Sequence, residues 1–447
     1  MLNKKPKQGF SGLIITFMLI IQVSCTEKTQ SDLTKESIIP QPVSVISTGE
    51  YFKLRSGTDV YIREKSDELK QIGQYLVDKL KLPTGFNVDL KVAGTKPHSG
   101  CFVLATDAAK SSLGEEGYEL AIGKRIIYLT AAKPAGLFRG IQTIRQLLPV
   151  KIESANRQEG PWEIPTGTIT DYPDYQYRGA MLDVSRHFFG VDDVKRITDL
   201  LASYAELNCD GKARELYTGT NVGFSTLCTT SAVTYKFIDD VIRELAALTP
   251  GPYIHIGGDE SHVTKIEDYI PFINMVQDIV AKHGKQVIGW DEIALASLKP
   301  NTIAQCWANV KNANTAVSQG AEILMSPASK AYIDMKYDKS TKLGLNWAGY
   351  IEVDTGYIWD PATLDPGIVR DNIIGIEAPL WTETITNMDE IEYMVFPRLP
   401  GYAEIGWTPA ASRSWEEYKI RLGKHGERFK AMGIDFYPSA LVPWAGL

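Results

Sequence analysis

The sequence contains no Cys-x-x-Cys pair, although five cysteines occur among its 447 residues. Zinc sites built on that spacing are therefore not expected. Basic residues are also outnumbered, because Lys and Arg total 47 against 54 for Asp and Glu. The resulting formal net charge of −7 argues against nucleic acid as a partner, since phosphate binding needs a basic face.

The N-terminal apolar run is too short to span a bilayer. Residues 13–21 read LIITFMLII, whereas a membrane-spanning helix needs about 20 apolar residues. The run follows three lysines, Lys4, Lys5 and Lys7. A basic segment followed by a short apolar core predicts a signal peptide over residues 1–24.

The signal peptide ends at a cysteine. Ser24 followed by Cys25 resembles the cleavage site of bacterial lipoproteins, in which the cysteine becomes the lipidated first residue. We therefore expect export to the bacterial cell envelope, a lipid anchor in the membrane at Cys25, and a polar tether over residues 25–37. The alternative is an ordinary signal peptide with an incidental cysteine.

Two further cysteines flank a loop rich in Gly and Thr. In an exported protein Cys209 and Cys228 could form a disulfide across this loop. The alternative is a pair of free thiols.

The rest of the chain divides into two domains with different patterns. Residues 38–168 combine short β-rich runs with two amphipathic segments, 67–80 and 135–148, and predict a small α+β domain. Residues 169–447 alternate apolar runs with amphipathic segments, which is typical of a parallel α/β sheet or barrel. We expect strands at 179–184, 253–256, 286–289, 302–305, 322–325 and 373–377, and helices at 191–206, 234–248, 263–283, 388–405 and 414–432.

Polar or aromatic residues follow most of these strands. Asp183, Trp290 and Trp307 are examples. Chemistry at the carboxyl ends of parallel strands is the rule for α/β barrels, so we expect the active site there. A closed barrel of this type needs eight strands, and the sequence predicts six.

The segment Tyr253-Ile-His-Ile-Gly-Gly-Asp-Glu260 carries the clearest chemistry. Its two glycines leave room for a ligand and free the backbone to turn. Neighbouring side chains on extended backbone point in opposite directions, so Asp259 and Glu260 cannot form the facing carboxylate pair of an ordinary retaining glycosidase. They can address two parts of one substrate, which suits a substrate that supplies its own nucleophile. The alternative is a solvated acidic loop.

His255, Asp259 and His262 together could suggest a metal site. Alternation places His255 inside a strand, where a hydrogen-bonded histidine is favoured, so we expect no metal. Tryptophans near the strand ends, Trp290, Trp307, Trp347 and Trp381, offer faces on which sugar rings can stack. The alternative for each tryptophan is core packing.

These motifs together resemble the β-N-acetylhexosaminidases of glycoside hydrolase family 20. The segments that carry the resemblance are Arg178-Gly-Ala-Met-Leu-Asp183 with Arg186-His187-Phe188, His255 to Glu260, Gly289-Trp-Asp-Glu292, Tyr332-Ile-Asp334 and Leu380-Trp-Thr-Glu383. The resemblance covers residues 38–440 and implies a TIM-type (β/α) barrel, at residues 169–447, behind a small N-terminal domain. It also implies exo-acting hydrolysis of terminal β-linked GlcNAc or GalNAc from glycans, with no cofactor.

The resemblance also implies a role for each matching residue. Glu260 is the general acid and base, and Asp259 orients the 2-acetamido group, whose oxygen attacks the anomeric carbon to give an oxazoline. The residues implied to bind the sugar are Arg178, Trp290, Trp307, Tyr332, Asp334, Trp347, Trp381 and Glu383. Of these, Tyr332 hydrogen-bonds the acetamido group, and Arg178, Asp334 and Glu383 hold ring hydroxyls.

One part of the family pattern is missing. Family members carry a His-x-His, an Asp-Asp-Gln-Gly-Trp and a Pro-Glu-Ile-Asp-Met-Pro-Gly-His segment between the first barrel strand and the HxGGDE strand, and residues 185–251 contain none of them. We infer an internal deletion of barrel strands two and three, joined near residues 200–208. Three interpretations remain: an active hexosaminidase, an inactive relative that at most binds amino sugars, and a structural envelope protein.

Overall fold

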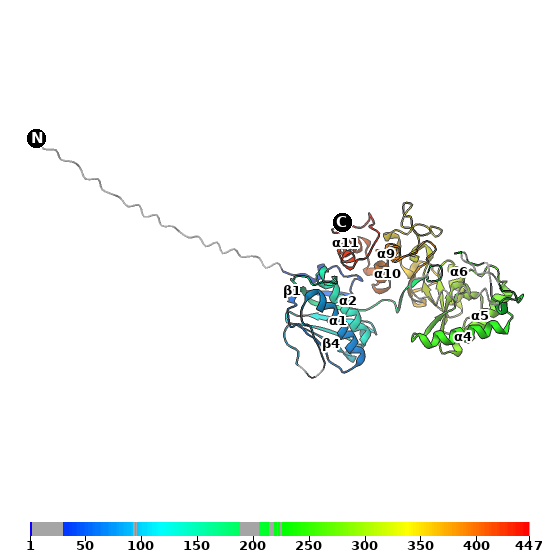
Figure 1. Cartoon of the computed structure of the whole chain (residues 1–447), viewed down its shortest axis with the longest axis horizontal. Coiled ribbons are helices and arrows are strands. Elements are labelled where there is room, and N and C mark those ends of the chain that lie inside the picture. The colour runs from blue at the N-terminus through cyan, green and yellow to red at the C-terminus, as the bar shows by residue number, and fades with distance from the viewer. Residues whose placement is uncertain are drawn as a thin grey trace. The chain divides into compact units, whose positions relative to one another are not determined.

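The computed structural model describes Met1 and residues 30–92, 94, 96–187, 205–213, 219–220, 222–223 and 226–446. Residues Ser31–Leu447 form one compact unit, which contains two sheets (Figure 1). The predicted signal peptide, Cys25 and most of the helix expected at 191–206 lie outside the described residues. Within the described ranges, no helix combines the length and the apolar character needed to cross a membrane.

The first sheet belongs to the predicted α+β domain. Its seven strands lie in the order β1-β7-β5-β6-β4-β2-β3. The strands are β1 (Ser44–Lys53), β2 (Val60–Ile62), β3 (Leu90–Val92), β4 (Cys101–Thr106), β5 (Tyr118–Ile122), β6 (Ile126–Ala131) and β7 (Glu163–Asp171). Helices α1 (Asp67–Thr84) and α2 (Pro134–Leu147) pack against each other and on the sheet (Figure 1). Short 3-10 turns cover Leu33–Lys35, Ala108–Leu113 and Val150–Glu153.

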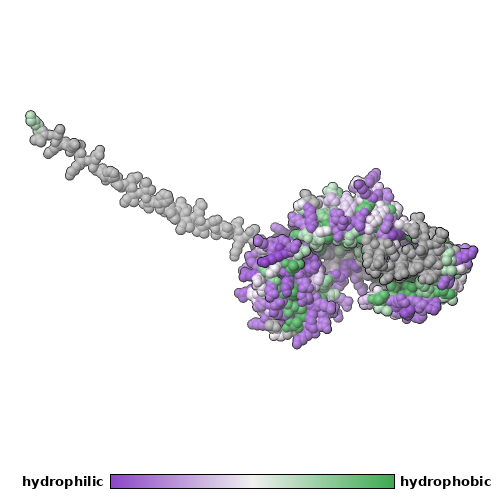
Figure 2. Space-filling view, in the orientation of Figure 1, coloured by the Kyte–Doolittle hydropathy of each residue, from purple (hydrophilic) through white to green (hydrophobic). Residues whose placement is uncertain are grey.

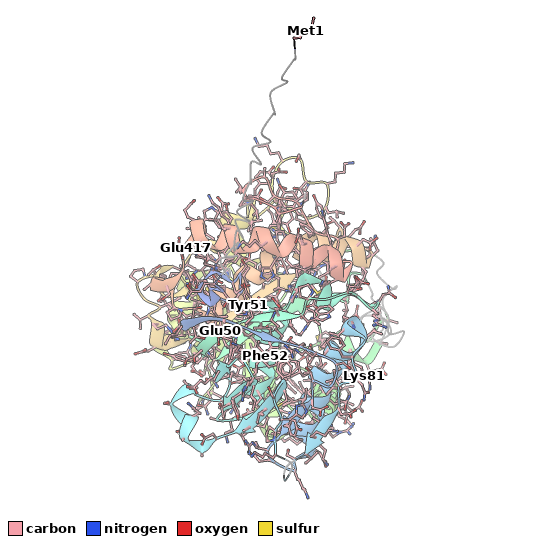
Figure 3. The ribbon with its side chains drawn as sticks, turned by 90° about the vertical axis from the view of Figure 1, so that its left-hand side faces the viewer. Met1, Glu50, Tyr51, Phe52, Lys81 and Glu417 are labelled. Carbon is pink, nitrogen blue, oxygen red and sulfur yellow. A yellow bond between two sulfur atoms is a disulfide. The ribbon has the colours of Figure 1, made fainter. Side chains whose placement is uncertain are left out.

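Local sequence explains these elements. Strand β1 alternates in exposure up to an irregularity between Ser47 and Tyr51, after which Phe52 is fully buried beside the more open Glu50 and Tyr51 (Figure 3). Helix α1 begins where the Ser66 side chain accepts a hydrogen bond from the Leu69 N–H. Strands β5 and β6 form a hairpin, since they pair antiparallel around the turn at 123–125.

The described end of the predicted tether is part of the fold. Leu33 is 1% exposed, and the Ser31 N–H donates to the Gly49 carbonyl on β1. Burying one leucine side chain contributes about 2 kcal/mol. Residues 31–37 are therefore docked on the small domain, and this part of the tether prediction is wrong. Strand β7 also extends the domain to Asp171, beyond the predicted boundary at 168.

The second sheet has the six strands that the sequence predicts. Every pairing is parallel, and the order is β8-β13-β12-β11-β10-β9. The strands are β8 (Tyr177–Leu182), β9 (Tyr253–His255), β10 (Gln286–Trp290), β11 (Ile303–Cys306), β12 (Glu322–Met325) and β13 (Ile373–Leu380). A cluster of Ile288, Ile303, Leu324 and Ile374 fills the inner face near the start of the strands.

Helices cover the outer face of this sheet. Contacts join α4 to β9, α5 to β10, α6 to β11 and β12, and α10 to β8 and β13. The helices are α4 (Ala232–Leu248), α5 (Ile266–Lys282), α6 (Val310–Ser318), α7 (Ala328–Ala331), α8 (Val353–Tyr357), α9 (Met388–Val395), α10 (Arg398–Trp407) and α11 (Trp415–Met432), with 3-10 turns at Ala205–Leu207, Asp291–Leu295, Pro361–Thr363, Arg370–Asn372 and Ala410–Ser412. The helix expected at 388–405 is two helices, because the sequence passes through Pro397, which lacks a backbone N–H.

The second sheet is open between β8 and β9, which are its two edge strands. Among the described strands, β8 pairs only with β13, and β9 pairs only with β10. Helix α4, next to the β9 edge, buries only Thr234 and Ile242, and its Leu248 is 78% exposed. An apolar strip lies on the surface in Figure 2 where Figure 1 labels α4. The opening falls where a complete barrel would carry strands two and three.

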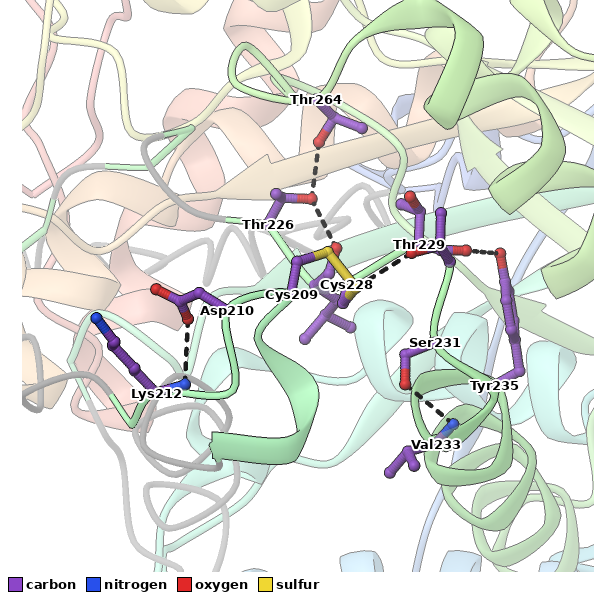
Figure 4. Close-up of a disulfide and its surroundings, with 12 residues drawn as sticks. Cys209, Asp210, Lys212, Thr226, Cys228, Thr229, Ser231, Val233, Tyr235 and Thr264 are labelled. Atoms are coloured by element: carbon purple, nitrogen blue, oxygen red, sulfur yellow. Dashed lines mark hydrogen bonds between the residues drawn. A yellow bond between two sulfur atoms is a disulfide. The ribbon is translucent and has the colours of Figure 1, made fainter.

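A disulfide lies near this opening. Cys209 and Cys228, the pair that the sequence put forward, are bonded with their Cα atoms 4.7 Å apart (Figure 4). The segment after Cys228 leads into α4, and Tyr235 on that helix donates a hydrogen bond to the Thr229 carbonyl at 2.6 Å. The disulfide therefore ties the described residues before α4 to the base of the helix.

Candidate active site

Polar and aromatic residues, most of them expected to carry chemistry, gather beyond the carboxyl ends of the six parallel strands. Each strand is followed within nine residues by one or more of them, as the rule for α/β barrels requires. They are Asp183 and Arg186 after β8, Asp259 and Glu260 after β9, Trp290 to Glu292 at the end of β10, Trp307 after β11, Tyr332 and Asp334 after β12, and Trp381 and Glu383 after β13.

The turn after β9 is held on several sides. Gly257 has φ 70° and Gly258 has φ 103°, a backbone that side chains rarely adopt. A Cβ on Gly258 would lie 2.6 Å from Ile293. The Trp290 N–H donates to the Gly257 carbonyl at 2.9 Å, and the Tyr269 hydroxyl donates to the Gly258 carbonyl at 2.7 Å. The two glycines thus let the chain turn tightly against its neighbours.

The turn ends on a strained residue. Glu260 has φ 48°, a left-handed conformation that costs a non-glycine residue about 1–3 kcal/mol. Such strain persists only where the surroundings hold the backbone, and it is concentrated at functional sites. The structure thus fixes Asp259 and Glu260 on a rigid turn at the mouth of the sheet.

Four carboxyl groups crowd this end of the sheet. Burial raises the pKa of Asp259, and the neighbouring Glu260 charge adds to the rise, while Arg186 opposes it. Burial also raises the pKa of Glu292 to about 7, although the Trp307 indole N–H donates to its carboxylate at 3.0 Å. Asp291 is fully buried and accepts hydrogen bonds from the Asn312 amide at 2.9 Å and the Trp307 backbone at 3.1 Å.

Five aromatic rings form a box beside the carboxylates. Trp290 lies 5.9 Å from Trp381 and 6.5 Å from Trp307, between ring centroids. Trp307 stacks at 6.4 Å on Tyr332, and Trp347 lies 6.0 Å from Trp307. Tyr332 is 2% exposed, whereas Trp347 is 56% exposed. The box therefore has a closed floor and an open rim, which suits a small ring-shaped ligand with apolar faces.

Buried oxygen atoms without partners mark the other side of the box. Asp334 is 2% exposed and neither of its carboxylate oxygens has a hydrogen-bond partner. One carboxylate oxygen of Glu383 is also buried without a hydrogen-bond partner, while the other lies 3.4 Å from the Arg186 guanidinium. Burial raises the pKa of Asp334 to about 7. Buried polar atoms are nearly always paired, so these oxygens are suited to accept hydrogen bonds from ligand hydroxyls.

Arg178 is not part of this cluster. Alternate residues on β8 face opposite sides. The Tyr177 hydroxyl donates to Glu377 inside the sheet at 2.7 Å, so Arg178 points outward. There its guanidinium binds Glu116 of the small domain at 2.5 Å and stacks over Trp407. The structure therefore contradicts the sugar-binding role implied for Arg178 and assigns it to the contact between the domains.

Arg186 occupies the place expected of Arg178. Its guanidinium lies 3.1 Å from Asp183, near Glu383, and 4.9 Å from the centre of the Trp381 ring. The sequence contained Arg186 in a quoted motif but gave it no role. Its position three residues after Asp183, just beyond the strand, was the available signal. Glu292 was missed in the same way. In the described part of the chain, no three His, Cys, Asp or Glu side chains gather as metal ligands.

Comparison with known families gives two matches that together cover most of the chain. "Glycosyl hydrolase family 20, catalytic domain" matches residues 175–209, 202–269 and 261–410. "Glycosyl hydrolase family 20, domain 2" matches residues 35–172. The first two catalytic segments overlap at residues 202–209, and the second and third overlap at residues 261–269.

Similar proteins have been characterised and solved. A β-N-acetylhexosaminidase of Cellulomonas fimi is 31% identical over 493 residues, covering 92% of this chain and 97% of its own. An N-acetyl-β-hexosaminidase of Streptomyces plicatus, solved with Thio-NAglucal, is 41% identical with a TM-score of 0.86 and covers 92% of this chain and 98% of its own. The family 20 enzyme of Streptomyces coelicolor A3(2) is 40% identical with a TM-score of 0.86, covering 93% of this chain and 100% of its own.

Proposed function

The chain belongs to glycoside hydrolase family 20, and from this membership we propose that it is an exo-acting β-N-acetylhexosaminidase that releases terminal β-linked GlcNAc or GalNAc from glycans. The observation that carries the proposal is the aromatic box beside the Asp259–Glu260 turn, with the unpartnered oxygens of Asp334 and Glu383 on its other side. A sugar ring stacks on indoles and offers hydroxyls to such oxygens.

The reaction proceeds through the substrate's own acetamido group. Glu260 donates a proton to the leaving oxygen as the bond to the anomeric carbon breaks. The acetamido carbonyl oxygen attacks that carbon, and the product is an oxazoline. Glu260 then takes a proton from water, which opens the oxazoline with overall retention. Asp259 orients and polarises the acetamido group, a role that suits a carboxylate on the same turn as the acid.

The remaining residues bind the sugar. Trp290, Trp307 and Trp381 wall the acetamido pocket and Tyr332 donates a hydrogen bond into it. Trp347 lines the rim. Asp334 and Glu383 accept hydrogen bonds from ring hydroxyls, and Arg186 takes the part first expected of Arg178.

We also propose that the chain lacks barrel strands two and three. The Cellulomonas fimi alignment is 493 residues long, so that relative has residues without a counterpart in this 447-residue chain. The open edges of β8 and β9 support the same interpretation. The open sheet also favours a second candidate function, that of an inactive relative that binds amino sugars without turnover.

We further propose export and lipid anchoring through Cys25. The support is the order of basic residues, short apolar core and Ser24-Cys25. Expression of the full chain with a labelled fatty acid tests this. Label present in the natural chain and lost in Cys25→Ala is the expected result, and unchanged labelling would contradict it.

Activity is tested on the full chain in detergent with an aryl N-acetyl-β-glucosaminide. We expect turnover that Glu260→Gln abolishes, and no turnover of the matching aryl β-glucoside, which lacks the acetamido nucleophile. No turnover from a folded sample, with GlcNAc still raising its melting temperature, would support the inactive relative. Equal cleavage of both aryl substrates would refute the substrate-assisted mechanism.

A further inference from the structure

We propose that His255 is a positioning residue, which holds the turn at Gly257 through its neutral form with the proton on Nε2, and that Gln305 selects this form. The inference rests on the proposed function, because the turn carries Asp259 and Glu260. It follows from the direction of each hydrogen bond in a chain that crosses the inner face of the sheet.

The chain begins at Glu377 on β13. Its carboxylate accepts from the Tyr177 hydroxyl at 2.7 Å and from the Gln305 side-chain amide at 2.9 Å. The same Gln305 nitrogen donates to the Ser326 hydroxyl oxygen at 2.8 Å. The Ser326 hydroxyl in turn donates its own hydrogen bond to the Glu377 backbone carbonyl at 3.0 Å. Two acceptors therefore fix the nitrogen end of the Gln305 amide.

The oxygen end of that amide then decides the state of the histidine. Gln305 Oε1 lies 3.1 Å from His255 Nε2, and an amide oxygen can only accept. His255 Nε2 must therefore carry a proton. On the other side of the ring, the Gly257 N–H lies 3.0 Å from Nδ1 and can only donate. Nδ1 must therefore be unprotonated, which leaves one neutral tautomer that satisfies both neighbours.

This hydrogen bond is at the start of the strained turn. Gly257 has φ 70° and leads within three residues to Glu260 with φ 48°. The other hydrogen bonds described for this turn are accepted by the carbonyls of Gly257 and Gly258. The His255 side chain, by contrast, accepts from a backbone N–H of the turn, that of Gly257. His255 also packs edge-on against Trp290 at 5.2 Å. The ring thus joins the catalytic turn to a wall of the acetamido pocket.

Two substitutions separate the two hydrogen bonds. Asparagine in His255→Asn can place its oxygen near the Nδ1 position and accept from Gly257, but it does not reach Gln305. Glutamine in His255→Gln can reach Gln305 and loses the acceptor beside Gly257. His255 is exposed at the sheet edge, so both variants are compatible with folding, and their melting temperatures serve as the check.

We expect His255→Asn to keep kcat within about threefold of the natural enzyme. We expect His255→Gln to lose at least tenfold in kcat, with KM within about threefold, because the sugar is held by residues on other strands. A tenfold loss corresponds to about 1.4 kcal/mol. Equal kcat values for the two variants, or a loss confined to KM, would overturn the proposal.

A second measurement does not depend on activity. The chain has six histidines, so nitrogen NMR of histidine-labelled full chain can report each ring, with His255→Asn identifying the signal. We expect a neutral ring with the proton on Nε2, and a shift of the His255 signal toward the cation in Gln305→Glu, because a carboxylate beside Nε2 still accepts its proton and favours the charged ring. An Nδ1-protonated or charged ring in the natural chain would overturn the proposal. Absence of turnover together with the expected tautomer would refute the proposed function alone.

Discussion

Replacing Asp334 with leucine should make the protein more stable and less active. Leucine keeps the branch at Cγ and removes two buried oxygens that have no partner in the free protein. An unsatisfied buried polar group costs about 1–3 kcal/mol, so the free energy of unfolding should rise. Because these oxygens are the proposed acceptors for sugar hydroxyls, kcat/KM should fall about 100-fold, equivalent to about 3 kcal/mol of lost hydrogen bonding.

The stability gain should depend on pH. Burial raises the pKa of Asp334 from 3.8 to about 7 in the folded protein. A carboxyl with a raised folded pKa contributes its full stability below about pH 4, and this contribution is lost as the pH rises to about 7. The loss amounts to about 4 kcal/mol over the whole window. Asp334→Leu has no such group, so its advantage over the natural chain should grow by about 2–3 kcal/mol between pH 5 and pH 7.5.

Urea unfolding at several pH values, followed by tryptophan fluorescence, measures this difference. Other titrating groups are common to both chains and largely cancel. GlcNAc should raise the melting temperature of the natural chain and leave that of Asp334→Leu unchanged. The reasoning is refuted if the variant is less stable at every pH, or if its advantage is the same at pH 5 and pH 7.5.

Three further predictions concern other parts of the molecule. Changing both Cys209 and Cys228 to serine opens a loop with a sequence separation of 19 and should lower the free energy of unfolding by about 3 kcal/mol, and reduction of the natural chain should reproduce this loss. Arg398→Met removes a donor from four buried backbone carbonyls, of which that of Met394 keeps the Tyr337 hydroxyl, and should cost about 3–5 kcal/mol in urea unfolding; a loss below 1 kcal/mol would contradict this account. Trp347→Ala should raise KM about tenfold with an unchanged melting temperature, because the ring is at the exposed rim and stacking is worth about 1 kcal/mol; Tyr350→Ala, a nearby exposed aromatic residue, should leave KM unchanged.

Much of the barrel was predictable because short apolar runs ending in polar residues define parallel strands locally. All six strands begin within two residues of their expected starts, and the family motifs lie at their carboxyl ends. The choice between Arg178 and Arg186 was not predictable in this way. It depends on whether the odd-numbered or the even-numbered residues of β8 face the inside of the sheet. That choice is set by Glu377, the inner partner of Tyr177, which is 200 residues away in the sequence.

The predicted tether failed for a related reason. Residues 31–37 are polar in composition, and they are held to β1 by the buried Leu33 side chain and by hydrogen bonds from Ser31 and from the Leu33 N–H. A single apolar residue such as Leu33 forms no periodic pattern in the sequence. Its burial depends on contacts with a distant part of the chain, here β1. The role of Glu292 is similar, because its position is fixed by an indole N–H that arrives from the following strand.

The strand order has a consequence for the order of folding. The small domain completes its sheet with β7, which ends at Asp171, so its pairings are available once that residue has left the ribosome. Strand β8 follows at once in the chain, yet its partner among the described strands is β13, which ends at Leu380. Strand β8 must therefore wait through the synthesis of about two hundred residues with its backbone unpaired. Chains that stop before β13 should therefore expose this unpaired strand, which chaperones and proteases would be the first to meet.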